Sequence, residues 1–314
     1  MNQLGQLLQE NTAGDPTGKR GLWTGKRLRQ LARELGQLGI RVSPQTVRRL
    51  LAQLGYALHA NTKSVSVCSA QREEQFRYIN RQRRRFLARC SPIISVDTKK
   101  KELVGPFKNA GRVWSRQPVA VNDHDFRSQA EGLATPYGIY DVLGNQGWVF
   151  VGRSHDTPDF AADNVAGWWR CSGRRNYPRA QELLILADSG GSNGARVRAW
   201  KCALQQQLAD RFGLPVTVCH YPTGASKWNP IEHRLFSEIS KNWAGQPLDS
   251  FPTILRLISE TTTQTGLRVN SRLVTKHYET GRKVSDQEMR ELRLKKHRTL
   301  PEWNYTLLPR ENRN

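Results

Sequence analysis

The sequence is poor in acidic residues, and its few cysteines are not clustered. It carries 27 Asp and Glu against 49 Lys and Arg, so its formal net charge is +22 and its pI is about 10.4. The five cysteines are odd in number and never form a CxxC pair. This pattern disfavours both a disulfide framework and a zinc ribbon, so we expect reduced thiols.

Long apolar runs and common processing signals are also missing. No stretch approaches the roughly 20 apolar residues of a membrane span. The start, MNQLGQLLQENTAG, lacks the basic region and apolar core of a signal peptide. The glycine-rich GGSNG has neither G-x-G-x-x-G spacing nor a Walker lysine, which argues against a nucleotide site. We therefore expect a soluble cytoplasmic protein without a membrane partner.

What the sequence does have is a large excess of positive charge on a chain that can fold. Hydrophobic residues make up 37% of it and there are nine tryptophans, enough for a core. Such an excess repels itself in a compact fold and usually marks a polyanionic partner, most often nucleic acid. We therefore expect a nucleic acid as the partner.

Two short helices are predicted near the N-terminus. Leucines and an alanine share one face of residues 24–39, and Ser43 with Pro44 starts a second helix that Gly55 ends. This unit is a candidate helix–turn–helix, whose second helix reads bases with its first residues. Those residues are Gln45, Thr46, Arg48 and Arg49. An ordinary helical hairpin with a solvated basic face is equally compatible with the segment alone, and the charge of the chain favours DNA.

The rest of the chain predicts a mixed α/β fold. Residues 69–87 predict a charged helix, whose arginine run either tracks phosphates or is a solvated face. Short apolar runs then predict strands: PIISVD, TPYGIYDV, GWVFVGRS, ELLILAD and LPVTVCHY. Three strands come in succession, and helices then alternate with strands, which indicates one mixed sheet with helices on its faces. Near the end, SDQEMRELRLKK predicts a capped helix, and PEWNYTLLP a segment docking on the body.

Three acidic residues occupy unusual positions. Asp97 and Asp188 each end an apolar strand, where open sheets carry functional groups, and Glu232 begins the helix after the next strand. If the two strands are neighbours, the carboxylates meet. Crowded carboxylates repel unless a cation neutralises them, and oxygen ligands suit Mg²⁺ or Mn²⁺. Two such ions can activate a nucleophile and stabilise the leaving oxygen of a phosphodiester.

Each acid also has an ordinary structural interpretation. Aspartate at a strand end often forms a turn. Glu232 lies three residues after Asn229, as in a capping box, and Glu288 follows Ser285 in the same way. Other nearby acids compete for the site: Glu102, Asp123, Asp125, Asp141 and Asp156.

Several neighbours of the three acids are candidates for supporting roles. The lysines Lys99, Lys100 and Lys101 are expected to grip DNA beside Asp97. His155 and His233 could touch the site, or could be packing and surface residues.

Long motifs along the chain resemble the Rhodopirellula-type DDE transposases of bacterial insertion sequences. They are SVDTKKKELVGPFKNAGR, LLILADSGGSNGAR, SKWNPIEHRLFSEISKNW, YETGRKVSD and EWNYT. NPIE is also similar to the third-acid motif of mariner-like transposases. The resemblance implies an RNase H-like catalytic fold with the triad Asp97, Asp188 and Glu232 as catalytic residues and ligands of two metal ions. It also implies cutting at the ends of the element, joining of the 3′-OH to target DNA, and a homo-oligomer on double-stranded DNA. A protein of this family is expected in the bacterial cytoplasm, associated with the nucleoid through its DNA binding.

The resemblance suggests a division into four parts. They are a helix–turn–helix region (1–62), a linker helix (63–90), an RNase H-like catalytic domain (91–247) and a basic, aromatic tail (248–314). Family members usually carry more sequence before the region that starts at Trp23, so a shortened copy is one expectation. The alternatives are a metal-dependent nuclease that cuts without joining, and a non-catalytic DNA-binding regulator.

Overall fold

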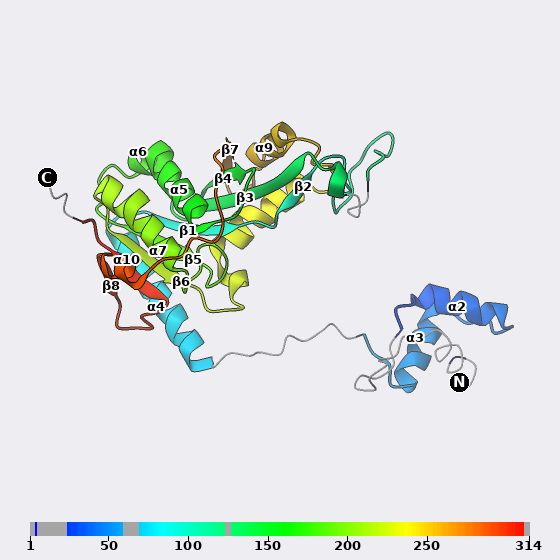
Figure 1. Cartoon of the computed structure of the whole chain (residues 1–314). Coiled ribbons are helices and arrows are strands. Elements are labelled where there is room, and N and C mark those ends of the chain that lie inside the picture. The colour runs from blue at the N-terminus through cyan, green and yellow to red at the C-terminus, as the bar shows by residue number, and fades with distance from the viewer. Residues whose placement is uncertain (1–3, 5–23, 59–68, 123–126, 311–314) are drawn as a thin grey trace. The chain divides into compact units, whose positions relative to one another are not determined.

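A computed structural model describes residue 4 and residues 24–58, 69–122 and 127–310 (Figure 1). The chain divides into two compact units, residues 1–66 and 67–314. Cys68, Asp123 and Asp125 lie outside the described residues.

Both predicted helices are present in the described part of the N-terminal unit. They are α2 (Leu28–Gln37) and α3 (Pro44–Gln53). Leu31, Leu35 and Val47 are buried between them. The Ser43 hydroxyl accepts a hydrogen bond from the Thr46 N–H at 3.1 Å and so caps α3. The pair is a helical hairpin, and use of it as a DNA-reading helix–turn–helix stays a prediction.

The second unit begins with the long helix α4 (Ser69–Ala88) and contains all the strands of the described residues. The strands are β1 (Ile93–Thr98), β2 (Glu102–Val104), β3 (Gly132–Asp141), β4 (Gln146–Gly152), β5 (Leu183–Ala187), β6 (Val216–His220), β7 (Arg268–Val274), β8 (Leu294–Lys296) and β9 (Asn304–Leu307). The further α-helices are α5 (Pro158–Trp168), α6 (Arg174–Asn176), α7 (Arg198–Leu204), α8 (Ser237–Asn242), α9 (Phe251–Ser259) and α10 (Asp286–Arg290). Short 3-10 or π-helical segments are η1 (Arg127–Gln129), η2 (Trp169–Gly173), η3 (Gln205–Asp210), η4 (Ser226–Trp228) and η5 (Glu232–Phe236).

The described strands form one mixed sheet, with the order β7-β4-β3-β1-β5-β6-β9-β8 and with β2 beside β3. β1, β3 and β4 are antiparallel neighbours, whereas β1, β5 and β6 run parallel. The predicted mixed α/β sheet flanked by helices is therefore confirmed, and all five strands predicted from apolar runs are present.

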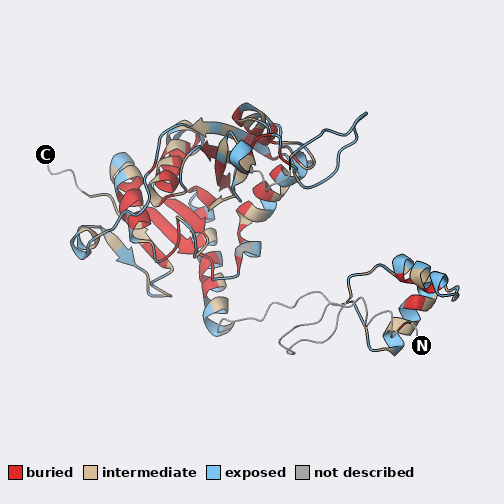
Figure 2. Ribbon diagram, turned by 45° about the vertical axis from the view of Figure 1, so that its right-hand side comes forward, coloured by how far each residue is buried: buried red, intermediate tan, exposed pale blue. Residues whose placement is uncertain are grey.

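Helices cover both faces of the sheet, so its central strands are buried (Figure 2). On one face, α5, α7 and η3 pack on residues such as Ile94 and Ile185. On the other face, α4 covers Ile93 and Leu184, while η5, α8 and α9 cover β3, β4 and β7. Strands covered on both faces favour apolar residues at nearly every position, which explains the run LLILA and, apart from Ser95, the run IISV.

The C-terminal segment completes the sheet. β9 pairs antiparallel with β6, and β8 pairs with β9. The segment expected to dock on the body is thus a strand of the body. The helix expected over SDQEMRELRLKK keeps its Ser285–Glu288 capping box but ends at Arg290, and LKK forms β8. The prediction of a continuous helix there was wrong because these three residues pair with β9.

The described residues also bear on the expectations about membrane spans and about the cysteines. None of their helices has the length and apolar character of a membrane span. Cys90, Cys171, Cys202 and Cys219 are free thiols.

Truncation of β9 tests its structural role. Leu307 is fully buried between β6 and β8, so Leu307→Ala is expected to lower the free energy of unfolding by about 2–5 kcal/mol. Leu133→Ala, at a position that is 40% exposed, is the control and should stay within about 0.5 kcal/mol of wild type in urea denaturation. Equal effects of the two substitutions would contradict β9 as an integral strand.

Candidate active site

The sheet register brings Asp97 and Asp188 next to each other. β1 and β5 are parallel, and their paired residues run from Ile93 with Leu184 to Val96 with Ala187. One step further along the same register, Asp97 faces Asp188. Both side chains follow the alternation of Ile93 and Leu184, which point to the face covered by α4. The two carboxylates therefore lie on one face at the C-terminal edge of two central strands.

Asn229 holds Asp188 in place from the helix side of the site. Its Nδ2 donates to Asp188 Oδ1 at 2.9 Å, and its Oδ1 accepts from the Ser95 hydroxyl. The Ser95 hydroxyl in turn accepts from the Ile231 N–H at 3.2 Å. Asn229 and Ser95 are fully buried, so these bonds satisfy polar groups that have no access to water. This series of hydrogen bonds links β1 and β5 to the start of η5.

Glu232 reaches the site on η5, which packs closely against β3. The Glu232 N–H donates to the Asn229 carbonyl at 3.1 Å. The Asn229 side chain bonds Ser95 and Asp188 and makes no cap of its own helix, so the alternative interpretation of Asn229–Glu232 as a capping box was wrong. Gly138, the register partner of Asp97, permits the packing. A Cβ there would lie 2.9 Å from Ile231 Cδ1, closer than real Cβ contacts.

The three carboxylates influence one another electrostatically. Burial raises the pKa of Asp97 to about 8, and the charges of Asp188 and Glu232 contribute to the rise. Burial also raises the pKa of Asp188, against the hydrogen bond from Asn229, which lowers it. The pKa of Glu232 is raised by burial and by Asp188, while His233 and Lys99 lower it. At all three positions, burial thus disfavours the ionised form of the carboxyl group.

The three carboxylates do not form a preformed metal-binding site. Among the described residues, no three His, Cys, Asp or Glu side chains are gathered closely enough to hold a metal ion. Their chemistry nevertheless fits a hard divalent cation, because they are oxygen donors on one face whose mutual repulsion a cation would relieve. Asp97 and Asp188 each have one oxygen in a hydrogen bond, Asp97 from the Thr98 N–H at 2.8 Å.

The competing acids mostly have structural partners. Asp141 accepts from the Tyr177 hydroxyl and from the N–H groups of the turn after β3. Glu102 pairs with Lys99 at 3.5 Å. Asp156 remains the nearest competitor, since its charge raises the pKa of Asp97 and its Oδ1 is buried without a hydrogen bond in the described structure.

The lysines and histidines predicted to assist are placed differently from one another. Lys99 is largely buried, pairs with Glu102 and lies over the Trp243 ring at 4.5 Å, whereas Lys100 and Lys101 are exposed. His233 is exposed and bonds the Lys227 carbonyl. His155 lies 3.3 Å from the Tyr278 carbonyl and stacks edge-on with His277. Whether any of them contributes to function stays a prediction.

Two site residues escaped sequence reasoning. Ser95 lies inside the buried strand β1, and its hydroxyl was the only available signal. His220 is fully buried at the end of β6 and bonds the Asp188 carbonyl through Nδ1 at 2.9 Å. Burial lowers the pKa of His220 to about 4, so the ring stays neutral.

Comparison of the sequence with known protein families identifies one that covers nearly the whole chain. A family model described as the Rhodopirellula transposase DDE domain matches residues 3–309. The chain belongs to this transposase family. No curated protein matches the chain.

Solved structures of another transposase are similar to this family member. The Mos1 transposase paired-end complex with left transposon end shares 16% identity over 82% of this chain and 69% of that chain, with a TM-score of 0.46. The Mos1 Strand Transfer Complex shares 17% identity over 82% and 69%, with a TM-score of 0.44.

The helix α3 of this transposase family member exposes the side chains predicted to read DNA. Gln45, Arg48 and Arg49 are exposed and Thr46 is half-buried. The face they occupy is therefore accessible, and its use in base reading stays a prediction.

Removal of the Asn229 side chain tests the buried chain of hydrogen bonds. Asn229→Ala removes the acceptor of the buried Ser95 hydroxyl and the donor to Asp188, so we expect the free energy of unfolding to fall by about 1–3 kcal/mol. Asn176→Ala, which removes an exposed amide, is the control and should change stability by less than about 0.5 kcal/mol. Equal unfolding free energies for the two variants would refute the buried role.

Neutralising Asp97 tests the repulsion between carboxylates. Asp97→Asn keeps an acceptor for the Thr98 N–H but removes a buried charge, so the variant should be more stable than wild type by about 1 kcal/mol in EDTA at pH 8. Asp163→Asn, which loses an ion pair with Lys276, is the control and should not be stabilised. A less stable Asp97→Asn protein without metal would contradict the repulsion.

Proposed function

We propose that the protein is a DNA transposase of an insertion sequence, which cuts at the ends of its element and joins the freed 3′-OH to target DNA. The main support for the proposal is that the strand register sets Asp97 beside Asp188, and that the charge of Glu232 raises the pKa of Asp97, in a member of a transposase DDE family. The sheet itself, three antiparallel strands followed by two parallel ones, supports an RNase H-like assignment for this unit.

Asp97, Asp188 and Glu232 would hold Mg²⁺ or Mn²⁺, with two ions expected. When bound, such ions supply an activated nucleophile and stabilise charge on the leaving oxygen of a phosphodiester. Three features of the protein itself favour binding of a cation by these acids. Asn229 orients Asp188, Gly138 lets η5 approach β3, and burial of the acids makes a cation the preferred way to relieve their repulsion.

Positive charge brings the substrate to this site. With a formal net charge of +22, the chain attracts the phosphates of double-stranded DNA over its whole surface. Within this proposal, α3 reads the terminal repeats, and exposed Lys100 and Lys101 lie beside Asp97 for backbone contact. Lys99 acts differently: its charge lowers the pKa of Glu232, so it helps keep that carboxylate ionised.

The proposed division of the chain follows the four expected parts, residues 1–62, 63–90, 91–247 and 248–314. The last part contributes β7, β8 and β9 to the same sheet as the acids, so we assign it to the body of the catalytic unit. A homo-oligomer on DNA remains an expectation, because an element has two ends to be joined.

Paired carboxylate substitutions test the catalytic assignment. Asp188→Asn and Glu232→Gln should each lower Mg²⁺-dependent cleavage and joining by about a hundredfold or more, since removal of a ligand takes away several kcal/mol of charge stabilisation. Glu288→Gln is the matched control, because Glu288 follows Ser285 by three residues, as Glu232 follows Asn229, and its carboxylate caps its own helix.

The assay uses a duplex with inverted-repeat ends from the DNA that flanks the gene, and a second duplex as target. Undiminished cleavage by Asp188→Asn would exclude this triad. Cleavage without joined product from a pre-cut end would indicate a nuclease rather than a transposase.

A further inference from the structure

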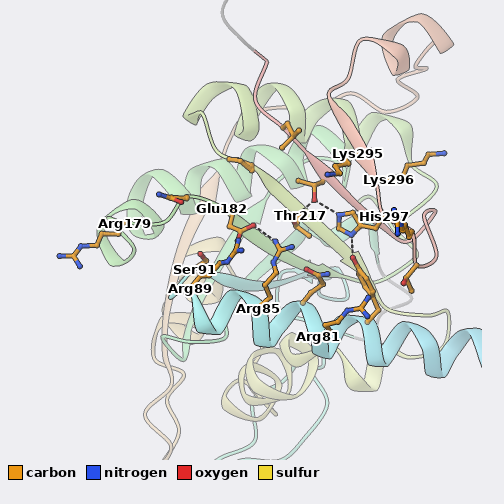
Figure 3. Close-up of a pocket in the computed structure, with 18 residues that line it drawn as sticks. Arg81, Arg85, Arg89, Ser91, Arg179, Glu182, Thr217, Lys295, Lys296 and His297 are labelled. Carbon is orange, nitrogen blue, oxygen red and sulfur yellow. Dashed lines mark hydrogen bonds and ion pairs between the residues drawn. The ribbon is translucent and has the colours of Figure 1, made fainter.

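A large basic cavity lies at the edge of the sheet opposite the acids (Figure 3). Its volume is about 1110 Å³, and it is lined by the C-terminal half of α4, the segment before β5, and β8 with the residues that follow it. Glu182 and Ser91, at its wall, precede β5 and β1, whereas Asp188 follows β5 and Asp97 is the next-to-last residue of β1. Asp188 lies six positions after Glu182, and at about 3.3 Å per residue this interval spans about 20 Å.

The cavity is strongly positive. Seven Lys and Arg side chains line it, and among the described residues Glu182 is its single carboxylate. Figure 3 shows Arg85 and Arg89 rising from α4 toward Glu182, to which they are joined at 2.6 and 2.8 Å. Glu182 thus fixes two guanidinium groups at the wall while neutralising only one of their charges.

The opposite wall carries cations without acidic partners. Lys295, Lys296 and Arg298 are exposed, and none of them pairs with a carboxylate within the described part of the chain. His297 lies among them, bonded to the Tyr78 hydroxyl and, at 2.8 Å, to the Thr306 hydroxyl. Burial together with the charges of Arg85 and Lys295 lowers the pKa of His297, which reports the positive field at this wall.

This arrangement suits a chain of phosphates better than a compact ligand. Small-molecule pockets are mostly apolar with a few polar groups, whereas the cations here are spread over two walls built from segments more than a hundred residues apart in sequence. Arginine pairs fixed in a fork geometry match phosphate oxygens, and lysines add point charges. Among the described residues that line the cavity, only the already-paired Glu182 carries a negative charge that would oppose a polyanion.

We propose that this cavity is a second DNA site, which binds the phosphate backbone of a duplex segment distinct from the one at the carboxylates. Successive phosphates of one DNA strand are about 3.4 Å apart along the duplex axis, so a separation of about 20 Å corresponds to about six phosphates. The cavity therefore cannot hold the scissile phosphate or its neighbours. The DNA partner rests on the proposed function, but binding here requires neither metal nor the three acids.

The first test measures DNA binding by the full chain in EDTA. Lys295→Gln/Lys296→Gln/Arg298→Gln should weaken binding of a fluorescent duplex and reduce the slope of log K against log salt by about 0.9 for each phosphate that the protein no longer neutralises. Arg175→Gln/Lys283→Gln/Arg290→Gln is the matched control, because it removes the same charge from exposed positions that do not line the cavity. An equal decrease of affinity and slope in the two variants would overturn the proposal.

A second test uses the unaltered protein, so that misfolding cannot explain the result. Lysine acetylation followed by mass spectrometry should show Lys295 and Lys296 protected by duplex DNA, while Lys283 stays reactive. Absence of protection would overturn the proposal, and so would equal protection by inorganic phosphate at the same phosphate concentration, which indicates a small-anion site.

The catalytic variants separate this inference from the proposed function. Asp188→Asn should retain protection of Lys295 and Lys296 by DNA while losing cleavage. If Asp188→Asn cleaves normally but protection persists, the triad fails and the second site stands. If cleavage is abolished as expected and protection is absent in wild type, the second site fails alone.

Discussion

The repulsion among three partly buried carboxylates is the constraint on which the rest of the catalytic unit depends. The parallel register of β1 and β5 sets Asp97 against Asp188, and the packing of η5 on β3 adds Glu232. Burial alone disfavours each charge, and proximity raises the cost further. A protein gains no stability from such an arrangement, which is typical of sites built to bind a cation or to do chemistry.

The surrounding structure holds the acids in this unfavourable position. The buried chain from Asp188 through Asn229 to Ser95 and the Ile231 N–H joins two strands to the start of η5. A fully satisfied buried polar network specifies one arrangement, because any slip leaves several groups unpaired. The C-terminal strands β9 and β8 extend the same sheet beyond β6 and build one wall of the basic cavity. The same sheet thus carries the acids at the C-terminal ends of β1 and β5, and the cations near the N-terminal ends of these strands.

The sequence predicted the centre of this fold better than its edges. Doubly covered strands such as β1 and β5 are continuous apolar runs, so their strand-end acids could be identified. β7 and β9 carry polar residues and pair with strands far away in sequence, and β8 is only three residues long, so local patterns could not find them. The capping-box signature was correct at Ser285–Glu288 and wrong at Asn229–Glu232. The Asn229 side chain has buried partners 134 and 41 residues away, and no local pattern reports those. The basic cavity was missed for the same reason, since its walls meet only in the folded chain.

A crystal structure of the protein with Mn²⁺, recorded at the manganese absorption edge, tests the central claim most directly. The account predicts anomalous density bonded to oxygens of Asp97 and Asp188, with the Glu232 carboxylate turned toward the same place. Density at another group of residues, or Glu232 folded back onto the Asn229 N–H with no ion near the two aspartates, would contradict it.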